Sequence, residues 1–291
     1  MSLEPKIGTV VLNFRTYQDT LDCVASLKKQ NYPNHEIVVV ENGSGNESEK
    51  VLHEAFDDDP MVTLIVSEEN LGFAKGNNLG IRYAHEKLNC DYVFVLNSDT
   101  IVPDGVFKEI VRVDCSDVGA ISPTVEDING IPQRPSENSD DILARIDYLR
   151  FGLFRAKILS LPLIHNLYHF YVKLKTQRHQ DDRCLAIYGK YVLQGCSYFL
   201  TPTFFQYYTQ LYPETFLYWE EANLLLYLQK VGLHSVAVDT PPVMHKGAQA
   251  TKTLVPDNAR ERRRLQFSFE SYRKSKPMFS MTYQEIKEKY N

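Results

Sequence analysis

Short apolar runs alternate with amphipathic stretches along the first half of the chain. The four runs are residues 7–12, 36–40, 62–66 and 92–96. They are rich in β-branched, leucine and aromatic side chains, which predicts strands buried on both faces. The stretches between them repeat apolar residues with a helical period, as Leu21, Val24 and Leu27 do. Alternating strands and helices predict an α/β fold with a doubly wound, mostly parallel sheet.

A small polar segment, Asn97-Ser98-Asp99-Thr100, directly follows the fourth run. In open α/β sheets, ligands bind outside the carboxyl ends of the strands. The Asp99 carboxylate has no basic neighbour in sequence, so we expect it to hold a divalent cation together with the phosphate that the cation carries. The alternative is a surface turn with a solvated aspartate.

Composition narrows the class of protein. The chain has 291 residues, of which 43% are hydrophobic, enough for one large domain or one domain with an appendage. The net charge of −5 argues against nucleic acid as a partner. Five scattered cysteines favour a reducing compartment and indicate neither a disulfide framework nor a zinc cluster. With no signal-like start and no apolar run of about 18 residues, we expect a cytoplasmic protein.

The turn after the first run excludes two common nucleotide-binding classes. Asn13-Phe14-Arg15-Thr16 stands where a dinucleotide-binding fold carries G-x-G-x-x-G, and the chain has no G-x-x-x-x-G-K-[ST] phosphate loop. A dehydrogenase or a P-loop enzyme is therefore not predicted.

Three loops, in order, carry a specific resemblance. ENGSGNES (41–48), ENLGFAKGNNLGIRYA (69–84) and LNSDT (96–100) resemble signature stretches of family-2 glycosyltransferases, most of all the rhamnosyltransferase-like and galactofuranosyltransferase-like members. The resemblance covers residue 7 to about residue 121. It implies the GT-A fold and the use of a nucleotide-diphosphate sugar as donor.

The resemblance also implies how the nucleotide is bound. Glu41, where the family usually has Asp, would accept the imide N–H of uracil or thymine. Gly72 lies in the segment 69–78, which we expect to be a loop; there it would let the backbone approach the ligand, and Asn77 would offer its amide. The alternative for this segment is an ordinary Gly/Asn loop with a helix cap. The implied nucleotide-binding residues are Asn13, Arg15, Glu41, Asn70, Gly72, Lys75, Asn77, Asn97, Ser98 and Asp99.

The second half resembles the acceptor side of the same family. Gly195 and Cys196 lie in a small-residue strand, 193–200, that would line the acceptor site; a buried strand with a bulge is the alternative. The stretch 216–224 is similar to the motif E-D-x-D-L, which gives the role of catalytic base to Glu221. Glu220 would orient an acceptor hydroxyl or structure the loop.

The same stretch carries an alternative explanation, a further expected contact and a departure from the family motif. Paired acids in a first helical turn are also favourable for the helix dipole alone. Trp219, the only tryptophan, would stack on a sugar. Asn223 stands where the family has a third acid.

A metal site follows from the resemblance as well. Asp99 matches the second acid of the family's metal motif, and Asn97 replaces the first. His245 stands where relatives complete the site, and imidazole and carboxylate suit Mn²⁺ or Mg²⁺. A lone histidine is otherwise more often structural.

The expected organisation is a GT-A domain over residues 1–250 and a C-terminal helical tail over 251–291. Within the domain, the nucleotide half spans about 1–122, a helical insertion about 133–183 and the acceptor half about 184–250. The insertion repeats apolar residues in two helical patterns, 142–153 and 163–174, with a basic face. That face is either solvated or an interface to an anionic membrane surface and a lipid-linked acceptor.

Together these features predict an inverting glycosyltransferase. The donor would be a UDP- or dTDP-sugar, with rhamnose as one candidate, and the acceptor a hydroxyl of a cell-surface polysaccharide or lipid-linked glycan. The enzyme would be cytoplasmic, or peripheral at the inner face of the membrane. The main alternative is a non-catalytic nucleotide-sugar or glycan-binding protein with the same fold. A sugar-1-phosphate nucleotidyltransferase would need a basic glycine-rich loop after the first strand, which residues 13–17 lack.

Overall fold

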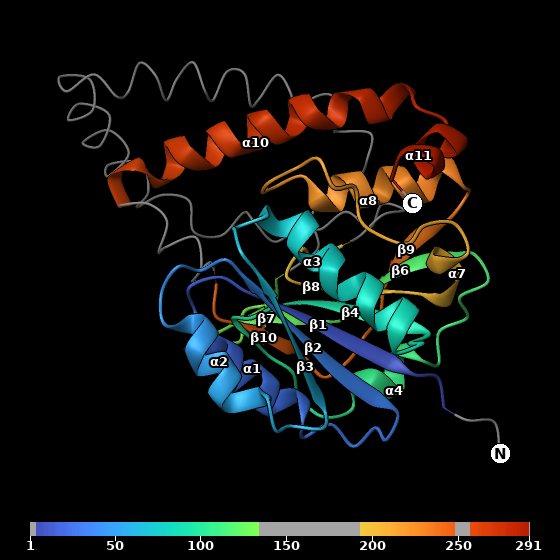
Figure 1. The fold of residues 1–291 in the computed structure, drawn as a ribbon. Coiled ribbons are helices and arrows are strands. Elements are labelled where there is room, and N and C mark those ends of the chain that lie inside the picture. The colour runs from blue at the N-terminus through green and yellow to red at the C-terminus, as the bar shows by residue number, and fades with distance from the viewer. Residues whose placement is uncertain (1–3, 134–192, 248–256, 291) are drawn as a thin grey trace, which may run out of the picture.

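A computed structural model describes residues 4–133, 193–247 and 257–290. In this part of the chain, seven strands form one central sheet and three short strands form a second (Figure 1). The central sheet has the order β3-β2-β1-β4-β8-β6-β9. Its strands are β1 (Ile7–Asn13), β2 (His35–Asn42), β3 (Val62–Ser67), β4 (Tyr92–Asn97), β6 (Val118–Ser122), β8 (Ser197–Leu200) and β9 (His234–Ala237).

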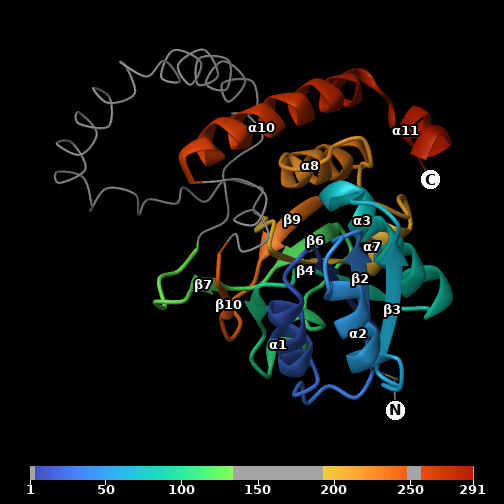
Figure 2. The same cartoon turned by 60° about the vertical axis from the view of Figure 1, so that its left-hand side comes forward.

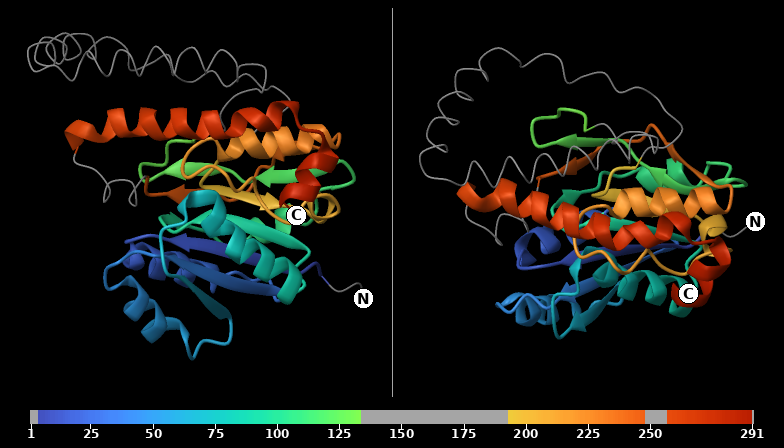
Figure 3. Two further views of the ribbon diagram at one scale, coloured as in Figure 1. Left: turned by 45° about the horizontal axis from the view of Figure 1, so that its top comes forward. Right: turned by 90° about the horizontal axis from the view of Figure 1, so that it is seen from above.

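Helices cover both faces of the central sheet. On one face lie α1 (Tyr17–Leu27), α2 (Ser48–Phe56) and α4 (Val106–Ile110). On the other lie α3 (Gly72–Arg82), its π-helical continuation η1 (Tyr83–Lys87), α7 (Pro202–Phe205), α8 (Glu220–Lys230), α10 (Asp257–Ser280) and α11 (Tyr283–Tyr290). The views in Figures 2 and 3 show α10 running across α8 on the outside of this layer.

The strands divide their apolar side chains between two cores. In β2, Ile37 and Val39 pack toward α1 and α2, whereas Val38 and Val40 pack toward α3. In β4, Phe94 belongs to the first core, where its ring stacks on Phe199 of β8 at 3.9 Å between centroids. Because successive side chains point to opposite faces, a strand buried on both faces needs a continuous apolar run. This explains the four runs, and the predicted doubly wound, mostly parallel sheet is confirmed.

Strand register brings the polar strand ends to one level. Asn13 is opposite Glu41 in the β1–β2 pair, and Leu12 is opposite Asn97 in the β1–β4 pair. Strand β8 runs antiparallel to β4, with Ser197 opposite Leu96. The amino end of β8 therefore lies beside the carboxyl end of β4, and the backbone N–H of Asn97 donates to the carbonyl of Cys196 at 2.9 Å.

The smaller sheet extends this edge. It consists of β5 (Thr100–Ile101), β10 (Val243–His245) and β7 (Val125–Asp127) in the order β5-β10-β7. Strand β10 is antiparallel to β5, with His245 opposite Thr100. The backbone N–H of Lys246 donates to the carbonyl of Asp99 at 2.8 Å. This pairing places His245 and Lys246 next to the loop that follows β4.

The expectation of a loop over residues 69–78 is wrong in its second part, because α3 already begins at Gly72. Gly and Asn are weak helix formers, so tertiary contacts decide here. A β-carbon at Gly76 would lie 2.8 Å from Leu12 Cδ1, and one at Gly80 would overlap Val10. The glycines thus form a flat helix face that packs directly on β1. The backbone N–H of Phe73 donates to the carbonyl of Phe216 at 2.7 Å, which satisfies one free N–H of the first turn.

Two other predictions concern the later part of the chain. The strand expected over 193–200 is shorter, since regular pairing starts at Ser197, and the predicted C-terminal helix is present as α10. The amphipathic patterns at 142–153 and 163–174 lie outside the described residues. Among the described helices, none combines the length and apolarity needed to cross a bilayer.

Candidate active site

The ends of β1 and β2 form the first part of the site. The amide of Asn13 donates to Glu41 Oε2, and the backbone N–H of Ser44 donates to Glu41 Oε1 at 2.7 Å. Glu41 is only 1% exposed. Both carboxylate oxygens therefore have protein partners, which orients the side chain; a contact with a nucleobase stays a prediction.

The β1 loop is fastened to the neighbouring loops. Arg15 has a positive φ of 63°; its N–H donates to Ser44 Oγ at 2.8 Å and its Nε to the Ser44 carbonyl at 2.9 Å. Thr16 Oγ1 lies 3.2 Å from Ser98 Oγ, in the loop after β4. Ser44 is thus a shared hydrogen-bond partner of Glu41 and Arg15. The motifs did not single it out, and its place in the polar loop 41–48 is the sequence feature that could have indicated this role.

The start of α3 contributes mainly internal contacts. Gly72 has a φ of +79°, and a β-carbon there would overlap the carbonyl of Phe216. Asn70 Oδ1 accepts from the N–H of Gly72 at 2.9 Å, while Asn77 is buried and its amide donates to the Phe73 carbonyl at 3.0 Å. Lys75 is exposed on the same helix. The group that lies close to the Gly72 backbone is thus the Phe216 carbonyl of the protein itself. Ligand contacts of Asn70, Gly72, Lys75 and Asn77 stay predictions.

Asp99 and His245 meet where the two sheets join. His245 Nε2 lies 3.4 Å from Asp99 Oδ1, and Asp99 is 5% exposed. The loop behind them is fixed by Lys246, whose Nζ is 2.9 Å from Asp19 Oδ1 and 2.9 Å from Asp22 Oδ2 on α1. Lys246 is a residue that sequence patterns did not single out as part of the site, because its partners are more than 220 positions away.

The donor set fits a divalent cation. Burial disfavours the charged imidazole of His245, but its interactions with Asp99 and Cys196 outweigh burial and raise its pKa to about 10. His245 Nε2 is buried without a well-formed hydrogen bond in the described part of the chain. Without a cation the ring is therefore protonated, and a bound Mn²⁺ would replace the proton on Nε2; a carboxylate oxygen and an imidazole nitrogen are ligands that Mn²⁺ accepts. Within the described ranges no group of three or more His, Cys, Asp or Glu side chains is placed to hold a metal ion by itself. Further ligands would therefore come from diphosphate oxygens and water.

Glu221 reaches the same region from α8. A β-carbon at Gly195 would overlap the Glu221 carboxylate, so the carboxylate lies directly over the Gly195 backbone. Cys196, the next residue, interacts with His245. Glu221, Gly195, Cys196, His245 and Asp99 therefore form a continuous series of neighbours, drawn from α8, the entry to β8, β10 and the loop after β4.

Gly195→Ala is expected to displace the Glu221 carboxylate, because the new methyl group needs the space that the carboxylate fills. A catalytic group misplaced by about 1 Å loses on the order of 100-fold in rate. We therefore expect the kcat of the sugar transfer that the sequence predicts to fall by about that factor, with nucleotide binding unchanged. Gly45→Ala is a suitable comparison in stability assays, since a β-carbon there meets no atom within 4 Å. Unchanged kcat in Gly195→Ala would show that the carboxylate position is not critical.

A strained turn sets the start of α8. Tyr218 and Trp219 have φ values of 70° and 76°, although neither is glycine. Such residues cost on the order of 1 kcal/mol each, and the surrounding contacts must compensate. Trp219 is 7% exposed and its ring lies 5.2 Å from that of Tyr272 on α10. The structure thus gives Trp219 a protein partner, and stacking on a sugar stays a prediction that requires this contact to open.

Glu220 differs from its neighbour in its surroundings. Its side chain is half-buried with Oε1 shielded from water, and burial together with the adjacent Glu221 charge raises its pKa to about 8. Glu220 Oε1 has no hydrogen-bond partner in the described part of the chain. Near neutral pH Glu220 therefore keeps its proton.

Glu220→Gln is expected to change how stability depends on pH. The pKa of Glu220 is about 8 in the folded state and 4.5 ordinarily. Its contribution to the free energy of unfolding is therefore fully present below pH 4.5 and is lost as the pH rises through 8. Glutamine imitates the neutral acid and carries no such loss. The Tm of the variant relative to wild type should therefore rise by on the order of 5 °C between pH 5 and pH 8. A constant Tm difference across this range would contradict the burial of an ionisable Glu220.

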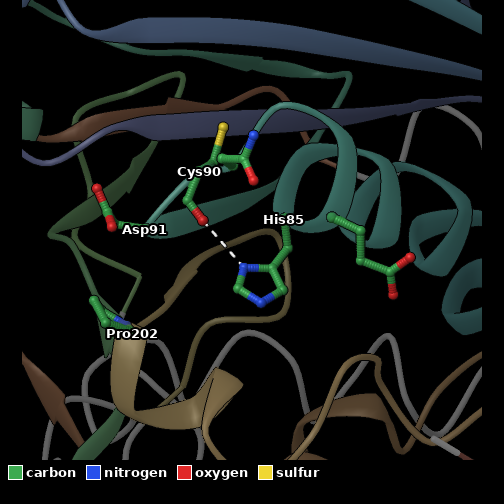
Figure 4. A pocket seen from close by; sticks show the side chains of 6 residues that line it. His85, Cys90, Asp91 and Pro202 are labelled. Atoms are coloured by element: carbon green, nitrogen blue, oxygen red, sulfur yellow. Dashed lines mark hydrogen bonds between the residues drawn. The ribbon is translucent and has the colours of Figure 1, made fainter.

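A separate cavity lies at the opposite edge of the sheet. It has a volume of about 440 Å³ and is lined by His85, Asn89, Asp91 and Pro202, among others. Figure 4 shows His85 beside the Cys90 carbonyl, to which its Nδ1 makes a 3.1 Å hydrogen bond. Because β4 runs from Tyr92 to Asn97 at about 3.3 Å per residue, this cavity is about 20 Å from the Asp99 loop. It is not part of the candidate site.

Comparison with known proteins agrees with the likeness of the loops. The family model described as "Glycosyl transferase family 2" matches residues 9–171, more than half of the chain. The chain belongs to glycosyltransferase family 2. Its matched region contains most of β1 and all of β2 to β7, and with them Asn13, Glu41 and Asp99.

Two curated relatives illustrate the membership. The low-salt glycan biosynthesis hexosyltransferase Agl10 of Haloferax volcanii is 28% identical over 206 residues, which are 70% of this chain and 59% of the relative. The glycosyltransferase GlyG of Streptococcus pneumoniae is 29% identical over 106 residues, 36% of this chain and 34% of the relative. This family-2 chain thus spans less than two thirds of the length of these relatives.

Solved structures agree with the GT-A fold of the family-2 chain. The mannosyltransferase PcManGT from Pyrobaculum calidifontis, in complex with GDP-Man and Mn²⁺, gives a TM-score of 0.53 at 10% identity over 91% of this chain and 70% of that one. S. aureus TarS 1-349 gives 0.52 at 14% identity over 97% of this chain and 74% of that one. At such identities the likeness concerns the fold.

Proposed function

We propose that this family-2 chain is an inverting glycosyltransferase that moves a sugar from a nucleotide-diphosphate donor to an acceptor hydroxyl. The observation that carries the proposal is the contact series from Glu221 through Gly195, Cys196 and His245 to Asp99. A base on one side and a cation-binding pair on the other suit a displacement in which a hydroxyl attacks and a diphosphate departs.

The proposed reaction exchanges one bond at the anomeric carbon for another. The acceptor oxygen forms a bond to the anomeric carbon while the bond from that carbon to the diphosphate oxygen breaks, and its electron pair leaves with the diphosphate. The hydroxyl proton passes to Glu221, whose carboxylate lies over the Gly195 backbone. A divalent cation bound by Asp99 and His245 would supply positive charge for the departing diphosphate.

The donor and acceptor belong to the proposal. A uridine or thymidine diphosphate sugar follows from the carboxylate at Glu41, and a hexose or N-acetylhexosamine is supported by the names of relatives such as Agl10 and the poly-β-1,6-N-acetyl-D-glucosamine synthase of Staphylococcus epidermidis. Rhamnose remains a candidate from the loop resemblance. The acceptor would be a hydroxyl of a growing cell-surface polysaccharide or a lipid-linked glycan.

An anionic membrane surface is a further part of the proposal, with action at the cytoplasmic face. The exposed cationic side chains of α10 support it: Arg263, Arg264, Arg273, Lys274 and Lys276. Binding to vesicles with and without anionic lipid, compared at low and high salt, tests this part.

A thermal-shift panel of UDP-, dTDP- and GDP-sugars, each with and without Mn²⁺, tests the donor. Ligands that bind the folded state raise its apparent stability, by about 2.7 kcal/mol at 100 times Kd. The expected result is a Tm increase with a uridine or thymidine diphosphate sugar that is larger with Mn²⁺. Assays for nucleoside diphosphate release then separate an enzyme from a non-catalytic binding protein, because only the enzyme releases it.

A further inference from the structure

Gln133 contacts the nitrogen of His245 that does not face Asp99. Gln133 Oε1 lies 3.1 Å from His245 Nδ1, whereas His245 Nε2 lies 3.4 Å from Asp99 Oδ1. The His245 side chain is 15% exposed, so few water molecules compete for either nitrogen. The imidazole ring is therefore held between an amide and a carboxylate.

Gln133 is itself fixed by its main chain. Its backbone N–H donates to the carbonyl of Val125 in β7 at 2.8 Å. Its carbonyl accepts from Gln194 Nε2 at 2.7 Å, and the N–H of Gln194 donates to Ser122 Oγ at 3.0 Å. The amide of Gln133 is thus presented to His245 from a backbone attached to β7 and to the segment that leads into β8.

The contact between Gln133 Oε1 and His245 Nδ1 determines which ring nitrogen keeps its proton. An amide oxygen only accepts, so it requires a proton on Nδ1. The proton that a cation can displace is then the one on Nε2, whose lone pair binds the cation. Histidine ligands of metals usually donate their other N–H to a carbonyl or carboxylate, which fixes ring orientation and tautomer. We propose that Gln133 is the positioning residue that orients His245 toward a divalent cation shared with Asp99. This inference rests on the cation site of the proposed function.

A packing role makes a different prediction from a positioning role. Methionine at position 133 has a similar shape, but its sulfur is a weak acceptor. Glutamate keeps acceptor oxygens at the same distance along the side chain. If Gln133 positions His245 by accepting from Nδ1–H, Gln133→Glu restores what Gln133→Met removes; if Gln133 only fills space, both variants behave like wild type.

The test measures Mn²⁺ binding to the full chain by electron paramagnetic resonance of free Mn²⁺, with UDP present. Gln133→Met is expected to weaken Mn²⁺ binding by about 10- to 100-fold, and Gln133→Glu to keep it within about threefold of wild type. The Tm of each variant without Mn²⁺ shows that it is folded. Gln30→Met is the matched control, because the Gln30 amide bonds to the carbonyls of Val102 and Pro103 and has no contact with His245.

His245→Ala separates this inference from the function on which it depends. If His245→Ala weakens Mn²⁺ binding and a folded Gln133→Met does not, the positioning role of Gln133 is overturned and the cation site stands. If neither His245→Ala nor Asp99→Asn changes Mn²⁺ binding, the cation site fails, and the role of Gln133 fails with it.

Discussion

Glu221→Gln is expected to lower the kcat of sugar transfer by about 10²- to 10⁴-fold, the usual contribution of a general base. Glutamine has nearly the same shape as glutamate, but its amide cannot take the proton of the acceptor hydroxyl. The carboxylate lies over the backbone of Gly195, and the glutamine amide has the same arrangement of heavy atoms. The Kd for the nucleotide should therefore stay near the wild-type value.

Single-turnover transfer and calorimetric nucleotide binding measure these two quantities separately. Glu109→Gln on α4 is a control for the loss of one negative charge, because Glu109 pairs with Arg112 on the helix surface. Normal turnover by Glu221→Gln would assign the base to another group. Loss of nucleotide binding in a folded Glu221→Gln protein would mean that Glu221 supports the donor site.

Asp99→Asn is expected to weaken Mn²⁺-dependent donor binding by at least about 100-fold, more than the loss of a group that only orients a ligand. An amide oxygen has the right shape but no charge, and the cation would lose its anionic protein ligand. His245 Nε2, 3.4 Å from Asp99 Oδ1, would remain as a neutral ligand. Because Asn is isosteric, the fold should be retained.

Calorimetric titration of the donor with and without Mn²⁺ provides the measurement. Asp117→Asn, an exposed position just before the amino end of β6, is the matched control and should bind the donor like wild type. A donor affinity in Asp99→Asn that still increases with Mn²⁺ as in wild type would show that Asp99 does not bind the cation.

At the start of α8, burial and a neighbouring charge raise the pKa of one of two adjacent glutamates. Glu220 and Glu221 are adjacent in sequence and both lie in a first helical turn. Partial burial of Glu220 beside a second carboxylate raises its pKa to about 8. Sequence similarity gives the base to Glu221, and the raised pKa of Glu220 argues against Glu220 in that role, since a base must be ionised near neutral pH.

Several features were determined by the sequence alone. Apolar runs such as 36–40 and 92–96 form strands because only a continuous apolar run can be buried on both faces of a sheet. Polar loops at the carboxyl ends of those strands share one edge because parallel strands point the same way. The predicted fold and the edge that holds Asn13, Glu41 and Asp99 follow from such local rules.

Other features were decided only by the tertiary structure. The start of α3 at Gly72 depends on packing against Leu12 and on the Phe216 carbonyl, which override weak helix propensity. Trp219 is directed to Tyr272 by a turn of positive φ that no local pattern encodes.

The contact of Gln133 with His245 joins positions 112 residues apart, and the antiparallel insertion of β8 brings Gly195 and Cys196 beside Asn97. Sequence periodicity reports burial and local conformation. Which distant side chains meet is fixed by strand order and register, and these depend on the whole chain.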